Sequence, residues 1–140
     1  MGNCCRKMAQ SPAITMTTIM VIGMGYRGWN VALHILTKMK FEKVICMDNY
    51  AKHDLQQEIV EKKMYNSIPA SQRIAMLNYH TKKFNADFEF GDISNIEETE
   101  RLFKKYQPDI VINCGKQYSS NFCNKNNTTF SYTLQNNVIG

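Results

Sequence analysis

Three glycines follow directly on a short apolar segment near the N-terminus, and this stretch limits the fold of the chain more than any other. They stand in VIGMGYRGW with the spacing Gly23-x-Gly25-x-x-Gly28. The apolar, partly β-branched run 18–22 before them is typical of a buried parallel strand. Apolar residues recur at helical spacing in residues 29–39. A glycine turn between a strand and a helix either cradles a phosphate or simply turns the chain.

Strands and helices alternate along the rest of the chain. Three further segments are predicted strands: KVICMD at 43–48 and DIVINC at 109–114, both buried, and the strictly alternating ADFEF at 86–90, which suits the edge of a sheet. Residues 50–83 favour two helices broken near Pro69, and SNIEETERLFKKYQP predicts a helix with a Ser94-x-x-Glu97 capping box. We therefore predict an α/β fold, a parallel sheet of the Rossmann type with strand order 3-2-1-4, flanked by helices.

An acidic residue strengthens the phosphate interpretation of the glycines. Asp48 ends the second predicted strand, 20 residues past Gly28. Gly23 would permit the tight turn, Gly25 would let the backbone approach a pyrophosphate, and Gly28 would let the helix pack close to the strand. Asp48 would accept hydrogen bonds from the adenosine ribose and repel a 2′-phosphate, which favours NAD over NADP. The alternative is a glycine turn without ligand, with Asp48 as a helix cap.

Several motifs together resemble one enzyme family. VIGMGYRGW, MDN, FEFGDI, LFKKYQPDIVIN and NNVIG occur in the order typical of the extended short-chain dehydrogenase/reductases, the NAD-dependent sugar-nucleotide epimerases and dehydratases. Trp29 after the last glycine, CGKQYSS after the fourth strand, NNVIG and the insert with SIPASQRI are similar to the UDP-sulfoquinovose synthases of that family. Those enzymes make the sulfolipid head-group donor from UDP-glucose and sulfite. The resemblance covers residues 18–140.

The resemblance implies roles for individual residues. The pyrophosphate loop would be formed by Gly23, Gly25, Tyr26, Arg27 and Gly28, the ribose would meet Asp48 and Asn49, and the adenine would lie against Asp92 and Ile93. The nicotinamide side would be lined by Cys114, Gly115 and Lys116, and the substrate side by Gln117, Tyr118 and Ser119, with Asn136 or Asn137 supporting the nucleotide. A UDP-sugar is the implied substrate, and a homodimer is usual for the full-length family members.

The chain also departs from the family pattern. Its glycine loop is one residue shorter than the usual G-x-x-G-x-x-G. Lys116 and Tyr118 flank Gln117 where the synthases have an acidic and a basic residue, so we expect a substrate-side charge pair to be lost. The catalytic Tyr-x-x-x-Lys of the family comes well after NNVIG, whereas this sequence ends at Gly140, so we expect no Tyr-x-x-x-Lys here. We expect the N-terminal, cofactor-binding part of a longer enzyme, with the sheet ending after the fourth strand and its following helix, and inactive by itself. The alternatives are another NAD-dependent sugar-nucleotide epimerase or dehydratase, or a non-catalytic NAD-binding module, with or without a lipid anchor.

Composition excludes other classes of function. The net charge is +5, but lysines and acids are interleaved, which indicates a solvated surface and no nucleic-acid site. Five cysteines without C-x-x-C, and three scattered histidines, favour reduced thiols and no metal centre. Residues 1–16 are expected to be a disordered leader before an NAD-binding domain at 17–140. Its start, MGNCCRK, could carry acyl chains on Gly2, Cys4 and Cys5 and anchor the chain to a membrane surface. The cytoplasm or an organellar stroma is the expected compartment, because the cysteines are expected to be reduced, and no apolar run is long enough to span a bilayer.

Overall fold

The computed structural model describes residues 17–51, 68–81 and 85–139. In chain order the elements are β1 (Thr18–Ile22), α1 (Tyr26–Lys38), β2 (Lys43–Asp48), α3 (Ala70–Thr81), β3 (Ala86–Phe90), α4 (Ile96–Tyr106), β4 (Ile110–Asn113), α5 (Ser120–Cys123), α6 (Asn127–Leu134) and the π-helical turn η1 (Gln135–Ile139). The expected leader, including Gly2, Cys4 and Cys5, lies outside the described residues, so both the leader and its acylation stay predictions.

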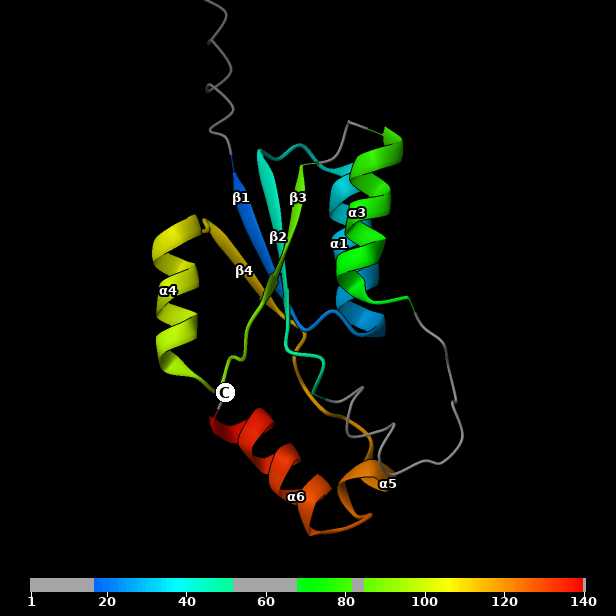
Figure 1. The fold of residues 1–140 in the computed structure, drawn as a ribbon, viewed down its shortest axis with the longest axis vertical. Coiled ribbons are helices and arrows are strands. Elements are labelled where there is room, and N and C mark those ends of the chain that lie inside the picture. Colours follow the sequence, from blue (N-terminus) through cyan, green and yellow to red (C-terminus); the bar gives the residue numbers. More distant parts are fainter. Residues whose placement is uncertain (1–16, 52–67, 82–84, 140) are drawn as a thin grey trace, which may run out of the picture.

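The four strands form one parallel sheet in the order β3-β2-β1-β4, as predicted. Val21 of β1 stands between Cys46 of β2 and Ile112 of β4. Helices α1 and α3 cover one face of the sheet and α4 covers the other, while α5 and α6 lie beyond the carboxyl ends of the strands (Figure 1). The βαβ units of the sequence prediction are therefore present, and the carboxyl edge is the place where such sheets bind ligands.

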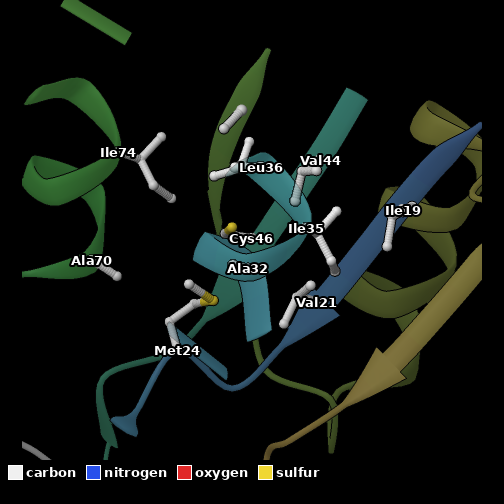
Figure 2. Close-up of a cluster of buried hydrophobic side chains, with 11 residues drawn as sticks. Ile19, Val21, Met24, Ala32, Ile35, Leu36, Val44, Cys46, Ala70 and Ile74 are labelled. Atoms are coloured by element: carbon white, nitrogen blue, oxygen red, sulfur yellow. The ribbon is translucent and has the colours of Figure 1, made fainter. Parts of the chain in front are cut away.

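Alternate residues of β1 and β2 supply two cores, one on each face of the sheet. Figure 2 shows the larger cluster, in which Ile19, Val21, Val44 and Cys46 face the helix α1 and the first turns of α3. The intervening residues face α4 and pack around Leu102. Because successive side chains of a strand point to opposite faces, an unbroken apolar run suits a strand that is covered on both sides.

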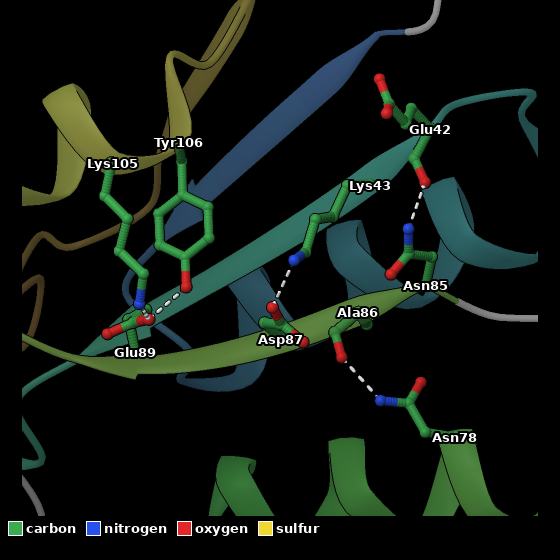
Figure 3. A network of polar contacts seen from close by, with 9 residues as sticks. All are labelled: Glu42, Lys43, Asn78, Asn85, Ala86, Asp87, Glu89, Lys105 and Tyr106. Carbon is green, nitrogen blue, oxygen red and sulfur yellow. Dashed lines mark hydrogen bonds and ion pairs between the residues drawn. The ribbon is translucent and has the colours of Figure 1, made fainter.

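The outer strand β3 has one apolar and one polar face, as its alternating sequence predicts. Phe88 packs into the larger core. On the other face Glu89 accepts hydrogen bonds from Lys105 and Tyr106 of α4, and Asp87 pairs with Lys43 of β2 at 2.6 Å (Figure 3). These polar contacts fix α4 and β2 to β3, beyond which the described part of the chain has no further strand.

Two expectations about local structure were wrong. The fourth strand was expected to be buried, but Ile110 and Val111 of β4 are 44% and 40% exposed. An apolar run alone does not distinguish a central strand from an outer one. In the predicted order 3-2-1-4 this strand is an outer one, and among the described residues β1 is the one strand beside it. The capping box was expected at Ser94, but Asn95 is the N-cap of α4 and accepts from the backbone N–H groups of Glu97 and Glu98. Within the described residues, no helix is both long and apolar enough to cross a membrane.

Candidate functional site

Two of the three glycines are required by close packing inside the protein. Gly23 has a φ of +83°, and a Cβ there would lie 2.5 Å from the Cα of Gly115. A Cβ on Gly28 would lie 1.9 Å from the carbonyl oxygen of Gly23. The first turn of α1 therefore packs directly against the loop after β1, and that loop packs against the segment after β4.

Gly25 is different, because nothing within the described residues requires a glycine there. Its backbone is extended, with φ −63° and ψ −163°, and a Cβ would meet no atom within 4 Å. Gly25 is the N-cap of α1 and supplies no side-chain cap, and no acidic residue stands in the first turn. The N-terminus of α1 thus presents backbone N–H groups and the positive end of its dipole to an open space, an arrangement that favours an anion.

Asp48 lies against the glycine loop, at the end of β2. One of its carboxylate oxygens accepts a hydrogen bond from the backbone N–H of Met24, and the other accepts from the N–H of Tyr50 at 2.7 Å. The neighbouring strand end supplies Asp92, which accepts from the side-chain amide of Asn49 at 2.8 Å. The sequence-predicted residues Asp48, Asn49 and Asp92 therefore lie together at the carboxyl edge, with Asn49 hydrogen-bonded to Asp92.

Asp92 is kept ionised by its hydrogen bonds. Partial burial works against its charge, but the hydroxyl and the backbone N–H of Ser94 and the amide of Asn49 all donate to the carboxylate and lower its pKa. Ile93, the next residue along the chain, packs on the core beneath α4 and lies near Gly115. An ionised acid and an apolar side chain thus stand next to each other at this strand end; their role at the adenine stays a prediction.

The segment after β4 is fixed to the glycine loop from one side and to η1 from the other. The backbone N–H of Cys114 donates to Ile22 at 2.7 Å. Asn136 donates to the carbonyl oxygen of Gly115, and Asn137 exchanges two hydrogen bonds of 2.8 Å with the backbone of Gln117. The two asparagines of NNVIG therefore support this loop. From the sequence, one of them was expected to support the nucleotide itself.

The residues predicted for the substrate side separate in the structure. Gln117 is buried, with 5% of its surface exposed, and its Nε2 has no hydrogen-bond partner among the described residues. Tyr118 is half exposed, and the guanidinium of Arg27 lies 4.0 Å from the centre of its ring. Ser119 accepts from the N–H of Phe122 and caps α5. Lys116 and Tyr26 extend into solvent.

A polar cavity of about 80 Å³ lies between the strand ends and α6. It is lined by Ala51, Asp92, Ser94, Tyr132, Gln135 and Asn136. Partial burial raises the pKa of Tyr132 to about 12, and the nearby carboxylates of Asp48 and Asp92 act in the same direction. Sequence reasoning missed Tyr132, because the six lining residues come from three segments far apart along the chain and no local pattern marks this tyrosine.

Tyr-x-x-x-Lys, which was expected to be absent, does occur once as a spacing, at Tyr79 and Lys83. Tyr79 stands on the last full turn of α3, close to the start of β3, and is 81% exposed. The amino ends of parallel strands lie at the edge opposite their carboxyl ends, so this tyrosine is far from the glycine loop. Lys83 lies outside the described residues. The spacing at Tyr79 is therefore unrelated to the candidate site.

The sequence profile of the NAD dependent epimerase/dehydratase family matches residues 19–140. This chain belongs to that family. NAD is the cofactor that the family name specifies, and the matched region contains the whole sheet, the glycine loop and the polar groups at the carboxyl edge.

One relative in sequence and one solved structure are similar to this chain. The chain is 33% identical over 123 residues to the chloroplastic UDP-sulfoquinovose synthase of spinach, Spinacia oleracea, covering 87% of this chain and 25% of that protein. The fold is similar to that of the Bordetella bronchiseptica enzyme WbmH, whose crystal structure contains NAD⁺, with a TM-score of 0.53, 18% identity, and coverage of 89% of this chain and 32% of that one. The chain thus spans a quarter of the length of its curated relative.

Proposed function

We propose that this chain binds NAD at the glycine loop and supplies the cofactor-binding part of an enzyme that modifies a nucleotide sugar, related to UDP-sulfoquinovose synthase. The observation that carries the proposal is Gly25. Its backbone would accept a side chain and its surroundings leave room for one, so a glycine there is explained by the close approach of a ligand.

The residues around Gly25 fit the groups of the dinucleotide in order. The N-terminus of α1 suits the pyrophosphate, because it combines free N–H groups with the positive end of the helix dipole. Asp48 stands beside the loop, where its carboxylate can accept from ribose hydroxyls and repels a 2′-phosphate. Asp92 and Ile93 follow at the next strand end for the adenine. When bound, NAD would supply a hydride acceptor through its nicotinamide ring, and the chain's residues would bind and orient the cofactor.

The substrate side is proposed from charge and placement. Arg27 and Lys116 bring two positive groups to the loop after β4, with Arg27 held over Tyr118. The diphosphate of a nucleotide sugar is anionic and would be attracted to such a pair. The family resemblance implied an acidic and a basic residue on either side of Gln117, but this chain has Lys116 and Tyr118 there. The positive charge near the substrate side would therefore come from Arg27 at the start of α1 as well as from Lys116 in the loop.

Calorimetric titration with NAD⁺ tests the proposal, with Asp48→Ala as the variant and Asp87→Ala as the matched control. Both substitutions remove one carboxylate from a strand of the same sheet, but Asp87 pairs with Lys43 on the face under α4. We expect wild type and Asp87→Ala to bind alike. Asp48→Ala should bind about tenfold more weakly, which is the effect of losing a charged hydrogen-bonding group. A folded wild-type chain that releases no heat with NAD⁺, or equal affinity in both variants, would refute the assignment.

A further inference from the structure

Arg73 connects a segment without any expected role to the glycine loop. It lies in α3, which returns from the insert between β2 and β3. Its Nη2 donates a hydrogen bond of 3.3 Å to the carbonyl oxygen of Met24, between the first two glycines. Its guanidinium carbon lies 4.3 Å from the centre of the Trp29 ring on α1. One side chain of α3 therefore contacts both the loop and the helix that follows it.

Met24 is held from both of its peptide groups. Its N–H donates to the carboxylate of Asp48, and its carbonyl oxygen accepts from Arg73. The Met24 side chain is 2% exposed and belongs to the core under α1. The peptide that Met24 shares with Gly25 includes this carbonyl, so the position of Arg73 bears directly on the orientation of the Gly25 N–H group.

The first turn of α3 is tied to the same network by a second contact. The hydroxyl of Tyr50 accepts from the N–H of Ser71 at 3.1 Å and lies 3.2 Å from its hydroxyl oxygen. The N–H of Tyr50 donates to Asp48, and its ring stacks on Phe88 of β3 at 5.4 Å. Asp48, Tyr50, Ser71 and Arg73 thus form one connected group.

Charge and burial indicate that Arg73 is more than a surface side chain. Burial lowers the pKa of the guanidinium, while Tyr50 and Asp48 act in the opposite direction. Its Nε is buried and has no hydrogen-bond partner among the described residues. The guanidinium of Arg73 lies over the ring of Trp29 and near the carboxylate of Asp48. Both interactions offset the free energy that the partly buried cation loses by giving up water.

We infer that Arg73 is a positioning residue for NAD: by holding the Met24 carbonyl, it fixes the Gly25 amide and the Asp48 carboxylate in the geometry that accepts the ADP-ribose half of the cofactor. The inference rests on the proposed function. It assigns part of the cofactor affinity to the insert between β2 and β3, through a residue that need not touch the ligand. A side chain that only packs α3 against α1 would affect stability and leave affinity unchanged.

The test uses Arg73→Met and Arg73→Lys, with Arg101→Met on the exposed side of α4 as the matched control. Methionine keeps an apolar contact with Trp29 and with the cavity walls at Met76 and Leu77, but it cannot donate to Met24. Affinity for NAD⁺ and for ADP-ribose is measured by calorimetry, well below each variant's thermal midpoint. We expect Arg73→Met to bind both ligands about tenfold more weakly, Arg73→Lys to fall between it and wild type, and Arg101→Met to equal wild type.

The outcomes separate this inference from the proposed function. A wild-type chain that does not bind NAD⁺ refutes the proposed function before any variant is compared. Wild-type affinity in Arg73→Met, with or without a lower thermal midpoint, overturns the positioning role. If Arg73→Met does not fold, Arg73→Lys tests the positioning role instead. Lysine keeps the positive charge but cannot stack on Trp29 and donate to the Met24 carbonyl at the same time. Unchanged affinity in Arg73→Lys overturns the inference, and weaker binding of NAD⁺ and ADP-ribose alike supports it.

Discussion

The same residue type meets three different demands in the glycine loop. Gly23 is needed for a left-handed backbone and for contact with Gly115, and Gly28 is needed for contact with the loop itself. Gly25 satisfies neither condition and faces open space. Contacts within the protein therefore explain two of the glycines, whereas no contact among the described residues explains the third, for which we propose a ligand.

Substitution of single glycines by alanine separates these demands. Gly23→Ala forces a Cβ into the backbone of Gly115 at a positive φ, and we expect it to lower the free energy of unfolding by about 2 kcal/mol or more. Gly25→Ala meets no atom, and its effect on the free energy of unfolding should stay below about 1 kcal/mol, while NAD affinity falls. Urea denaturation of both variants measures the first quantity. Equal destabilisation by the two substitutions would show that Gly25 also serves the fold.

Cys46 makes stability depend on alkaline pH. Burial raises the pKa of its thiol from 9.0 to about 12, an effect that Arg73 partly opposes. A pKa that is higher in the folded state gives stability that is complete below pH 9 and is lost as pH rises toward 12. By about pH 10.5 the loss should be about 2 kcal/mol.

Urea denaturation of wild type and Cys46→Ala across this pH range measures that loss. The wild-type free energy of unfolding should fall more steeply with pH than that of Cys46→Ala, because the variant lacks the buried thiol. Parallel curves for the two proteins would mean that Cys46 ionises in the folded state as readily as in the unfolded one.

At the scale of elements, the strands were the most predictable part of the fold. The expected bounds 18–22, 43–48 and 86–90 are those of β1, β2 and β3. These segments carry their periodicity in the sequence, and side-chain alternation distinguishes the outer strand β3 from β1 and β2. The sequence of β4 is as apolar as that of β1 and by itself predicts burial, whereas the predicted order 3-2-1-4 already places β4 at the outside of the sheet, where its exposure is expected.

At the start of α4 the sequence offers two adjacent residues that could cap the helix, and the wrong one was predicted. Ser94 and Asn95 are both good caps, but only Asn95 accepts from the first turn of α4, while the Ser94 hydroxyl donates to Asp92. Asn95→Ala should lower the free energy of unfolding by about 1 kcal/mol and leave NAD affinity unchanged. Ser94→Ala should weaken NAD binding through Asp92. Thermal denaturation measures the stability of the two variants, and calorimetry measures their affinity for NAD⁺. If Ser94→Ala were destabilised and Asn95→Ala were not, Ser94 would be the cap after all.

At the scale of the whole molecule, the site is assembled from contacts that sequence patterns do not reveal. The glycines, Asp48 and Asp92 were predicted from the sequence because each stands at or just after the end of a strand in a recognisable motif. Arg73 and Tyr132 were missed because they reach the site from helices whose placement depends on tertiary packing. Asn136 and Asn137 were found, but their role in holding the loop after β4 became visible only through their hydrogen bonds.

The central claim is that this chain binds NAD at the carboxyl edge of its sheet, with Gly25 at the point of closest approach. The most direct test is an NMR titration of the ¹⁵N-labelled chain with NAD⁺, in which backbone amide shifts report both binding and its location. We predict saturable shifts concentrated at residues 23–28, 48–51, 92–94 and 114–116, with little change along the outer face of α4. A spectrum that does not change at saturating NAD⁺, or whose changes lie on α4 and spare the glycine loop, would contradict the account.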